Sequence, residues 1–456
     1  MRYLLIVLLL VVFAGCDGLF GKKDIGKNTE IVPELIDSND IVPYARYYIV
    51  KYQELIKQTT INADDAQSIA EKLIKVADKY PTSRYADDAL FLSGKLYYET
   101  GSYQQAADLF KKVYTQYPEG MISPESNKFG YTYHIAPIAH LYYAMTLDFY
   151  SDQLAVAAGE YNRILQSYAK YAEERYVLDN VSGNVSAEAQ FNSGYAQERL
   201  KNYMFAVQEY MRTVLRYSGY YLSKQEGERH DYADMALERI YIIATGEAKQ
   251  PDQANIYLKE MLNQMIFTEY FPKIRYYLGC IALDQKHYAD ALQYFRDNIN
   301  ALRSNSFSDV DLMIATLEKI KYIESLHIQE VQALTENLTE YLAKSILHGK
   351  ELTNESDEAL VTDLLAGETL LFLSKLYYEQ HKKDLAAKYI TQVFQRYPYI
   401  VSSNGTFLTI KAAELIKKNV SQEEYISLLT DLISFIPEKY EPKQILRKEL
   451  GTHANK

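Results

Sequence analysis

Apolar and polar residues follow a helical pattern along most of the chain, and this pattern repeats. Residues 91–94 (Phe-Leu-Ser-Gly) recur as 191–194 (Phe-Asn-Ser-Gly), and residues 95–99 recur unchanged as 375–379 (Lys-Leu-Tyr-Tyr-Glu). In each of these units an alanine stands twelve positions after the small residue, which is the spacing of two helices that meet at a small-residue contact. Such internal similarity is typical of a solenoid, in which each unit packs only on its neighbours.

Other stretches of the chain also predict helices. Residues 311–327 and 329–348 place apolar residues at i, i+3 and i+4, which indicates one more helix pair. Asp87 and Asp88 fit the first turn of a helix, where the helix dipole favours negative charge, and Ser421 begins a capping box. No convincing series of alternating strands appears. The sequence therefore predicts an all-α fold.

The repeated units resemble the tetratricopeptide repeat. The best unit places Leu90, Gly94, Tyr97, Ala106, Phe110 and Pro118 at the positions that this family prefers. Weaker units match with Gly194, Ala206, Gly279, Ala291, Phe295, Tyr377, Ala386 and Pro398. The resemblance implies a right-handed superhelical solenoid of helix pairs that pack through these residues. The anchoring alanines are unevenly spaced, so we expect an irregular array over residues 41–440 and a capping tail at 441–456.

The first residues predict the compartment. A positive Met1-Arg2 precedes the apolar run Leu4 to Phe13, which is shorter than the ~20 residues that span a bilayer. This pattern predicts a signal peptide at residues 1–15. Residues 13–16 (Phe-Ala-Gly-Cys) resemble the bacterial lipobox, and this resemblance implies acylation of Cys16. An ordinary signal peptide with an incidental cysteine is the alternative.

On the lipoprotein interpretation, residues 16–40 are a lipidated N-terminus and tether, rich in glycine and polar residues. Several acyl chains on Cys16 would keep the protein on its membrane. We expect a bacterial envelope protein on the outer membrane, facing the periplasm. With Cys16 acylated, only Cys280 remains, so no intramolecular disulfide can form.

Composition and motifs exclude several classes of function. The net charge of −11 argues against non-specific binding to nucleic acid or to an anionic lipid surface, because both need a basic footprint. The motifs of phosphate, dinucleotide, acyl-transfer and zinc sites are absent. His134 and His140 are six residues apart, which is not the spacing of metal ligands on one helical face. We therefore expect neither catalysis nor a cofactor or metal.

Tyrosine is the unusual residue, with 44 in 456 positions. The resemblance implies that Tyr97 and Tyr377 pack between helices, and that four other tyrosines line the concave groove and bind a protein partner. These four are Tyr98, Tyr142, Tyr276 and Tyr378. A rigid aromatic ring with a polar tip suits such contacts. Alternatively, tyrosine fills the thin core of the solenoid as a half-buried side chain.

The segment 80–89 together with the Gly94 unit is similar to periplasmic tetratricopeptide lipoproteins, both BamD-like and YbgF-type. This similarity implies a non-catalytic scaffold for protein partners, in outer-membrane protein assembly or envelope maintenance. A glycan-binding lipoprotein of the SusD type is the first alternative, against which the absence of tryptophan counts. An enzyme whose site carries no known motif is the second.

Overall fold

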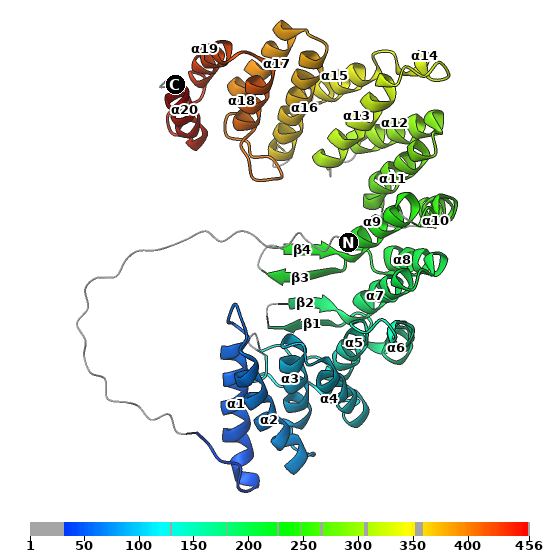
Figure 1. The fold of residues 1–456 in the computed structure, drawn as a ribbon, viewed down its shortest axis with the longest axis vertical. Coiled ribbons are helices and arrows are strands. Elements are labelled where there is room, and N and C mark those ends of the chain that lie inside the picture. Colours follow the sequence, from blue (N-terminus) through cyan, green and yellow to red (C-terminus); the bar gives the residue numbers. More distant parts are fainter. Residues whose placement is uncertain are drawn as a thin grey trace, which may run out of the picture.

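The computed structural model describes residues 32–454 except 128–129, 180, 226–227, 247, 265–267, 305–308 and 352–358. Helices dominate this part of the chain and follow one another in pairs along an open arc (Figure 1). The predicted all-α solenoid is confirmed. One helix of each pair lies on the concave side of the arc and is called inner here, and the other is called outer.

The helices have the following bounds. The inner helices are α1 (Ile41–Leu55), α3 (Ala86–Glu99), α5 (Ile135–Leu147), α7 (Val185–Arg199), α9 (Tyr232–Thr245), α11 (Phe271–Asp284), α13 (Val310–Ser325), α16 (Ala359–Glu379) and α18 (Leu408–Asn419). The outer helices are α2 (Ala63–Lys79), α4 (Tyr103–Gln116), α6 (Leu154–Ser167), α8 (Tyr203–Arg216), α10 (Pro251–Gln264), α12 (Tyr288–Ser304), α15 (Leu338–Glu351), α17 (Lys383–Arg396) and α19 (Gln422–Ile433). The short α14 (Gln332–Thr335) precedes α15, and α20 (Glu441–Ala454) follows α19.

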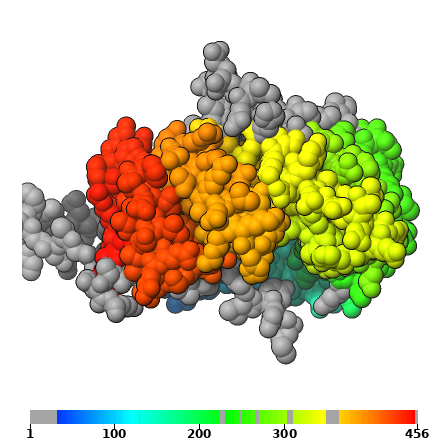
Figure 2. All heavy atoms as spheres, turned by 90° about the horizontal axis from the view of Figure 1, so that it is seen from above, coloured from blue at the N-terminus to red at the C-terminus, as the bar shows by residue number. Residues whose placement is uncertain are grey.

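The C-terminal helices continue the array. The predicted pair at 311–327 and 329–348 corresponds to α13 and α15, with α14 between them. The predicted capping tail contains α20, whose Leu446 is fully buried. Seen from above, the C-terminal pairs follow one another as adjacent slabs, from red through orange and yellow to green (Figure 2). Within the described residues, no helix is long and apolar enough to cross a membrane.

Short turns join each inner helix to its outer helix. Four of them have three residues and a central residue in the left-handed region, with φ of +79° at Gly101, +61° at Lys201, +62° at Lys286 and +58° at His381. A residue with a Cβ pays roughly 1–2 kcal/mol in this conformation, so only the first of these turns has the unstrained residue. The shared geometry shows that the four helix pairs turn in the same way.

The longer connections, from an outer helix to the next inner helix, carry β-structure that the sequence pattern did not predict. β1 (Arg175–Leu178) and β2 (Val181–Asn184) precede α7, and β3 (Tyr221–Gln225) and β4 (Glu228–Asp231) precede α9. The strands form one antiparallel sheet in the order β1-β2-β3-β4 on the concave side (Figure 1). Strands of four or five residues are too short for a clear alternating pattern, and their pairing depends on stacking of neighbouring helix pairs.

Small residues set the distance between the helices of a pair. A Cβ on Gly94, Gly194 or Gly279 would lie 2.8, 2.8 or 2.5 Å from the ring of Phe110, Tyr210 or Phe295 on the outer helix. The alanines twelve positions after these glycines have no exposed surface, and they are Ala106, Ala206 and Ala291. Ala386, twelve positions after Ser374, is buried in the same way. In the three pairs that contain a glycine, the helices therefore pack around an aromatic ring that leaves no room for a larger residue.

We predict that Gly279→Ala lowers the free energy of unfolding by about 1–3 kcal/mol, because the methyl group would overlap the Phe295 ring. Gly159→Ala is the control, since no atom lies within 4 Å of the site of its Cβ in α6. The control should raise stability by roughly 0.5–1 kcal/mol through helix propensity. Thermal or denaturant unfolding tests both variants, and equal melting temperatures would contradict the proposed close contact.

Candidate functional site

Tyrosine hydroxyls bonded to carboxylates connect the elements of the solenoid. Tyr161 of α6 donates to Asp148 at the end of α5, and Tyr210 of α8 donates to Glu198 at the end of α7. Burial, with the adjacent carboxylate, raises the pKa values of both phenols well above the ordinary value, so each hydroxyl keeps its proton and acts as a donor. Similar bonds join Tyr52 to Asp179, Tyr171 to Glu119, Tyr220 to Glu173, Tyr270 to Asp231, Tyr377 to Glu340 and Tyr425 to Glu449.

Basic side chains from the next inner helix complete some of these links. Arg239 of α9 pairs with Glu198, and its Nε lies 3.0 Å from Glu198 Oε2. Arg199 donates to the carbonyl of Asp148 at 2.7 Å. Consecutive helix pairs are therefore joined by a tyrosine, an acidic residue and an arginine that come from different helices.

The hairpin of β1 and β2 occupies the concave side of the N-terminal helix pairs. Asp179 at its tip accepts a bond of 2.8 Å from Tyr52 of α1. Tyr176 donates to Glu188 of α7 at 2.7 Å, and Tyr133 and Asn127 both donate to the carbonyl of Val177, at 3.1 and 2.7 Å. The hairpin of β1 and β2 therefore fills this part of the groove.

Lys95 of α3 is buried under this arrangement, with 5% of its surface exposed. Its ammonium donates to Glu99 at 2.7 Å and to the hydroxyl of Tyr142 at 3.2 Å, and it lies 4.6 Å from the centre of the Tyr142 ring. Burial alone would lower the pKa of Lys95, but Tyr142, Glu99 and Asp179 raise it overall. Lys95 is therefore a charged structural residue.

The structure places the four predicted groove tyrosines differently from the expectation. Tyr142 and Tyr378 are only 5% and 6% exposed, so the prediction that they face an open groove is wrong. Tyr142 lies beside buried Lys95, and Tyr378 belongs to the C-terminal apolar core. Tyr98 is half-buried, with its ring 5.4 Å from that of Tyr142, and Tyr276 is also half-buried. Partner contact by Tyr98 or Tyr276 stays a prediction.

The predicted packing residues lie as follows. Tyr377 is buried at 1% exposure, whereas Tyr97 is half-buried like its neighbour Tyr98. Burial therefore does not separate Tyr97 from Tyr98 as the repeat pattern suggested. Pro118 and Pro398 lie just beyond the ends of α4 and α17.

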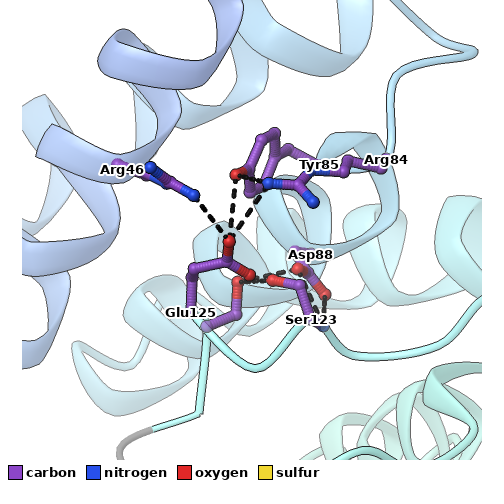
Figure 3. A network of polar contacts seen from close by, with 7 residues as sticks. Arg46, Arg84, Tyr85, Asp88, Ser123 and Glu125 are labelled. Carbon is purple, nitrogen blue, oxygen red and sulfur yellow. Dashed lines mark hydrogen bonds and ion pairs between the residues drawn. The ribbon is translucent and has the colours of Figure 1, made fainter. Parts of the chain in front are cut away.

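A second polar network fixes the first helix pair to the rest (Figure 3). Glu125, in the connection between α4 and α5, accepts from Arg46 of α1 at 2.9 Å and from Arg84 at 3.1 Å. The Tyr85 hydroxyl lies 3.4 Å from the same oxygen. The hydrogen bond from Arg46 contributes most to a lowered pKa of Glu125. Sequence analysis missed Glu125, because nothing in the local pattern links residues 40 to 80 positions apart.

The adjacent carboxyl groups, Asp87 and Asp88, are buried at the start of α3. Asp88 accepts from the backbone N–H of Ser123 at 3.1 Å and from the Ser126 hydroxyl at 2.7 Å. Burial raises the pKa of Asp87 to about 6, and burial together with Asp87 raises that of Asp88 to about 7. Both residues lie in the first turn of α3, as the sequence pattern predicted, and the side chain of Asp88 also binds the loop.

The groups that could suggest chemistry have structural partners. His140 lies 2.8 Å from Glu160, and His134 lies 2.9 Å from Glu174. Cys280 is a buried free thiol, and burial raises its pKa to about 11. No group of three or more His, Cys, Asp or Glu in the described part of the chain could hold a metal ion.

The N-terminal helices match a known protein family in sequence. Residues 62–120, which contain α2, α3 and α4, match the tetratricopeptide repeat model. This segment is therefore similar to a tetratricopeptide repeat. No curated protein matches the chain significantly in sequence.

Solved structures of similar fold have low identity to the chain. The apo quorum sensor NprR from B. thuringiensis is 16% identical, over 75% of this chain and 86% of that one, with a TM-score of 0.28. The P58(IPK) TPR domain is 13% identical, over 90% and 97% of the two chains, with a TM-score of 0.23. The Cut9 complex with Hcn1 of the APC/C is 13% identical, over 92% and 84%, with a TM-score of 0.24. These scores carry no argument about function.

We predict that Tyr176→Phe and Tyr232→Phe each lower the free energy of unfolding by about 1.5–3 kcal/mol, because both hydroxyls donate to buried Glu188. Tyr150→Phe, at an exposed position, is the control and should change stability by less than about 0.5 kcal/mol. Denaturant unfolding measures all three variants. If the three behave alike, the bonds to Glu188 contribute nothing to stability.

Proposed function

We propose that this chain is a non-catalytic lipoprotein of the bacterial cell envelope, in which a tetratricopeptide solenoid binds protein partners. Lipid on Cys16 holds it on the outer membrane facing the periplasm, where it serves outer-membrane protein assembly or envelope maintenance. The signal peptide and Cys16 lie outside the described residues, so the sequence pattern alone supports the anchor. The repeat match and the helical solenoid support a scaffold suited to protein interaction.

The observation that carries the binding proposal is the difference between the two halves of the concave side. The hairpins β1–β2 and β3–β4 lie over the N-terminal half (Figure 1). The described residues between 232 and 400 contain no strand, and there the inner helices α9, α11, α13 and α16 follow one another. We therefore place partner binding on the concave face of these four inner helices.

The side chains of this face suit a peptide or protein surface. Tyr322 of α13 is 51% exposed, on the side of the helix away from its buried residues such as Leu317. Nearby positions of α13 form ion pairs with α16, Lys375 with Glu318 at 2.7 Å and Lys321 with Glu379. An exposed aromatic ring flanked by charges of both signs is a common composition for a recognition surface.

The binding surface can be tested with two exposed tyrosines on opposite sides of the solenoid. Tyr322→Ala should weaken partner capture from detergent-solubilised envelopes at least tenfold, since a central aromatic contact is worth ~2 kcal/mol or more. Tyr341→Ala on outer helix α15, where the residue is 67% exposed, is the control. Both variants should melt like the wild type. Equal loss in both variants, or full capture by Tyr322→Ala, would place binding elsewhere.

The membrane anchor has its own test. Cys16→Ser should abolish acylation and release the protein from the membrane fraction, because no other anchor is proposed. Metabolic labelling with a clickable fatty acid and fractionation of cells measure the two effects. Normal acylation of the Cys16→Ser protein would refute the lipoprotein assignment without bearing on the binding surface.

A further inference from the structure

The connection between α4 and α5 fastens three parts of the N-terminal region. Glu125 in this connection takes bonds from Arg46 of α1 and Arg84 before α3 (Figure 3). Asn127 donates to the Val177 carbonyl of β1, and Ile122 pairs with Tyr133 through a backbone bond of 3.0 Å. A change in this connection would reach α1, α3 and the hairpin that fills the groove.

Asp87 and Asp88, at the start of α3, contact the same connection. Asp88 has no exposed surface and accepts from Ser123 and Ser126. Asp87 is 7% exposed and so close to the backbone at Gly120 that a Cβ there would lie 2.4 Å from its Oδ2 atom. The carboxyl group of Asp87 also accepts a bond of 3.0 Å from the backbone N–H of Asp88.

Apart from the N–H groups at the start of α3, the described groups around this pair supply no positive charge. Among the described residues, neither Asp87 nor Asp88 has a basic side chain within ion-pair distance, because Arg46 and Arg84 both bind Glu125. Tyr117 lies near Asp87 and also near Asp78 of α2, and Tyr133 lies near Asp88. All of these neighbours are neutral or acidic. Ionisation of both aspartates would therefore place two adjacent negative charges in a buried site without a counter-ion.

We propose that Asp87 and Asp88 form a pH-sensitive latch, which holds the connection between α4 and α5 closed in mildly acidic surroundings and loosens it as the pH rises through neutrality. The latch acts through Ser123 and Ser126 on the loop and, through Asn127, on the hairpin. It is independent of the proposed partner-binding face, which lies on α9 to α16.

The direction of the effect follows from the pKa values. Those of Asp87 and Asp88 rise from 3.8 to about 6 and about 7 in the folded chain. Their contribution to stability is complete below pH 3.8 and is lost as the pH rises through 6 and 7. Glu125 acts in the opposite sense, since its pKa is lowered, mainly by the hydrogen bond from Arg46. Together they make the connection most stable in mildly acidic solution.

Hydrogen exchange of the full chain tests the latch. A carboxyl group with a pKa near 7 makes opening about tenfold more favourable at pH 8 than at pH 6. Protection factors of amides 120–127 should therefore fall about tenfold over this range, after correction for the intrinsic exchange rate. Asp88→Asn should remove this dependence, because an amide does not ionise. Asp65→Asn, in the exposed first turn of α2, should retain it.

A second variant keeps the test decisive if Asp88→Asn does not fold. Asp87→Asn leaves the Ser123 and Ser126 bonds to Asp88 but removes the neighbouring negative charge that raises the Asp88 pKa. Protection should therefore change less between pH 6 and pH 8 than in the wild type, and the remaining change should shift to lower pH. If protection in the wild type is constant from pH 6 to 8, the latch is refuted. An Asn variant that loses the same protection at every pH, with the wild-type dependence intact, would also refute it.

Discussion

The hydrogen bond from a tyrosine hydroxyl to a carboxylate is the interaction on which this solenoid depends. A thin stack of helix pairs buries few residues per unit, so each junction needs side chains that are apolar along their length and polar at the tip. Tyr161, Tyr210 and Tyr425 each bury an aromatic ring and pair the hydroxyl with an acidic residue of another element. Because burial keeps these phenols protonated, the bonds persist at neutral pH.

The small buried surface of each helix pair also explains how the two halves of the concave side differ. In the N-terminal half, the long connections fold into hairpins that add buried surface to the inner helices, and Tyr176 and Leu178 of β1 are each 2% exposed. The same hairpins fill the groove that a partner would otherwise use. The inner helices from α9 to α16 lack such hairpins in the described chain, so an aromatic side chain such as Tyr322 of α13 remains accessible. Stabilisation and recognition are thus assigned to different parts of one array.

Sequence reasoning was most accurate where contacts are local. The glycine-to-aromatic contact within a pair joins residues 16 positions apart, such as Gly94 and Phe110, and both lie in one recognisable pattern. The same pattern located α13 and α15 from apolar periodicity alone. It failed for Tyr142 and Tyr378, because a repeat position fixes the side of the helix but not what covers it. The hairpin over Tyr142 belongs to a connection more than 25 residues downstream.

The amino-acid sequence by itself determined the helical pairs, their small-residue contacts and the solenoid class, since these depend on periodicity and side-chain size over one unit. Only the tertiary structure decided the sheet, the burial of Lys95 and the pairings of Tyr52 with Asp179 and of Arg46 with Glu125. Those pairs are 127 and 79 residues apart. Polar side chains can satisfy one another at that separation only when stacking has fixed the loops in place, and no local pattern specifies which donor will meet which acceptor.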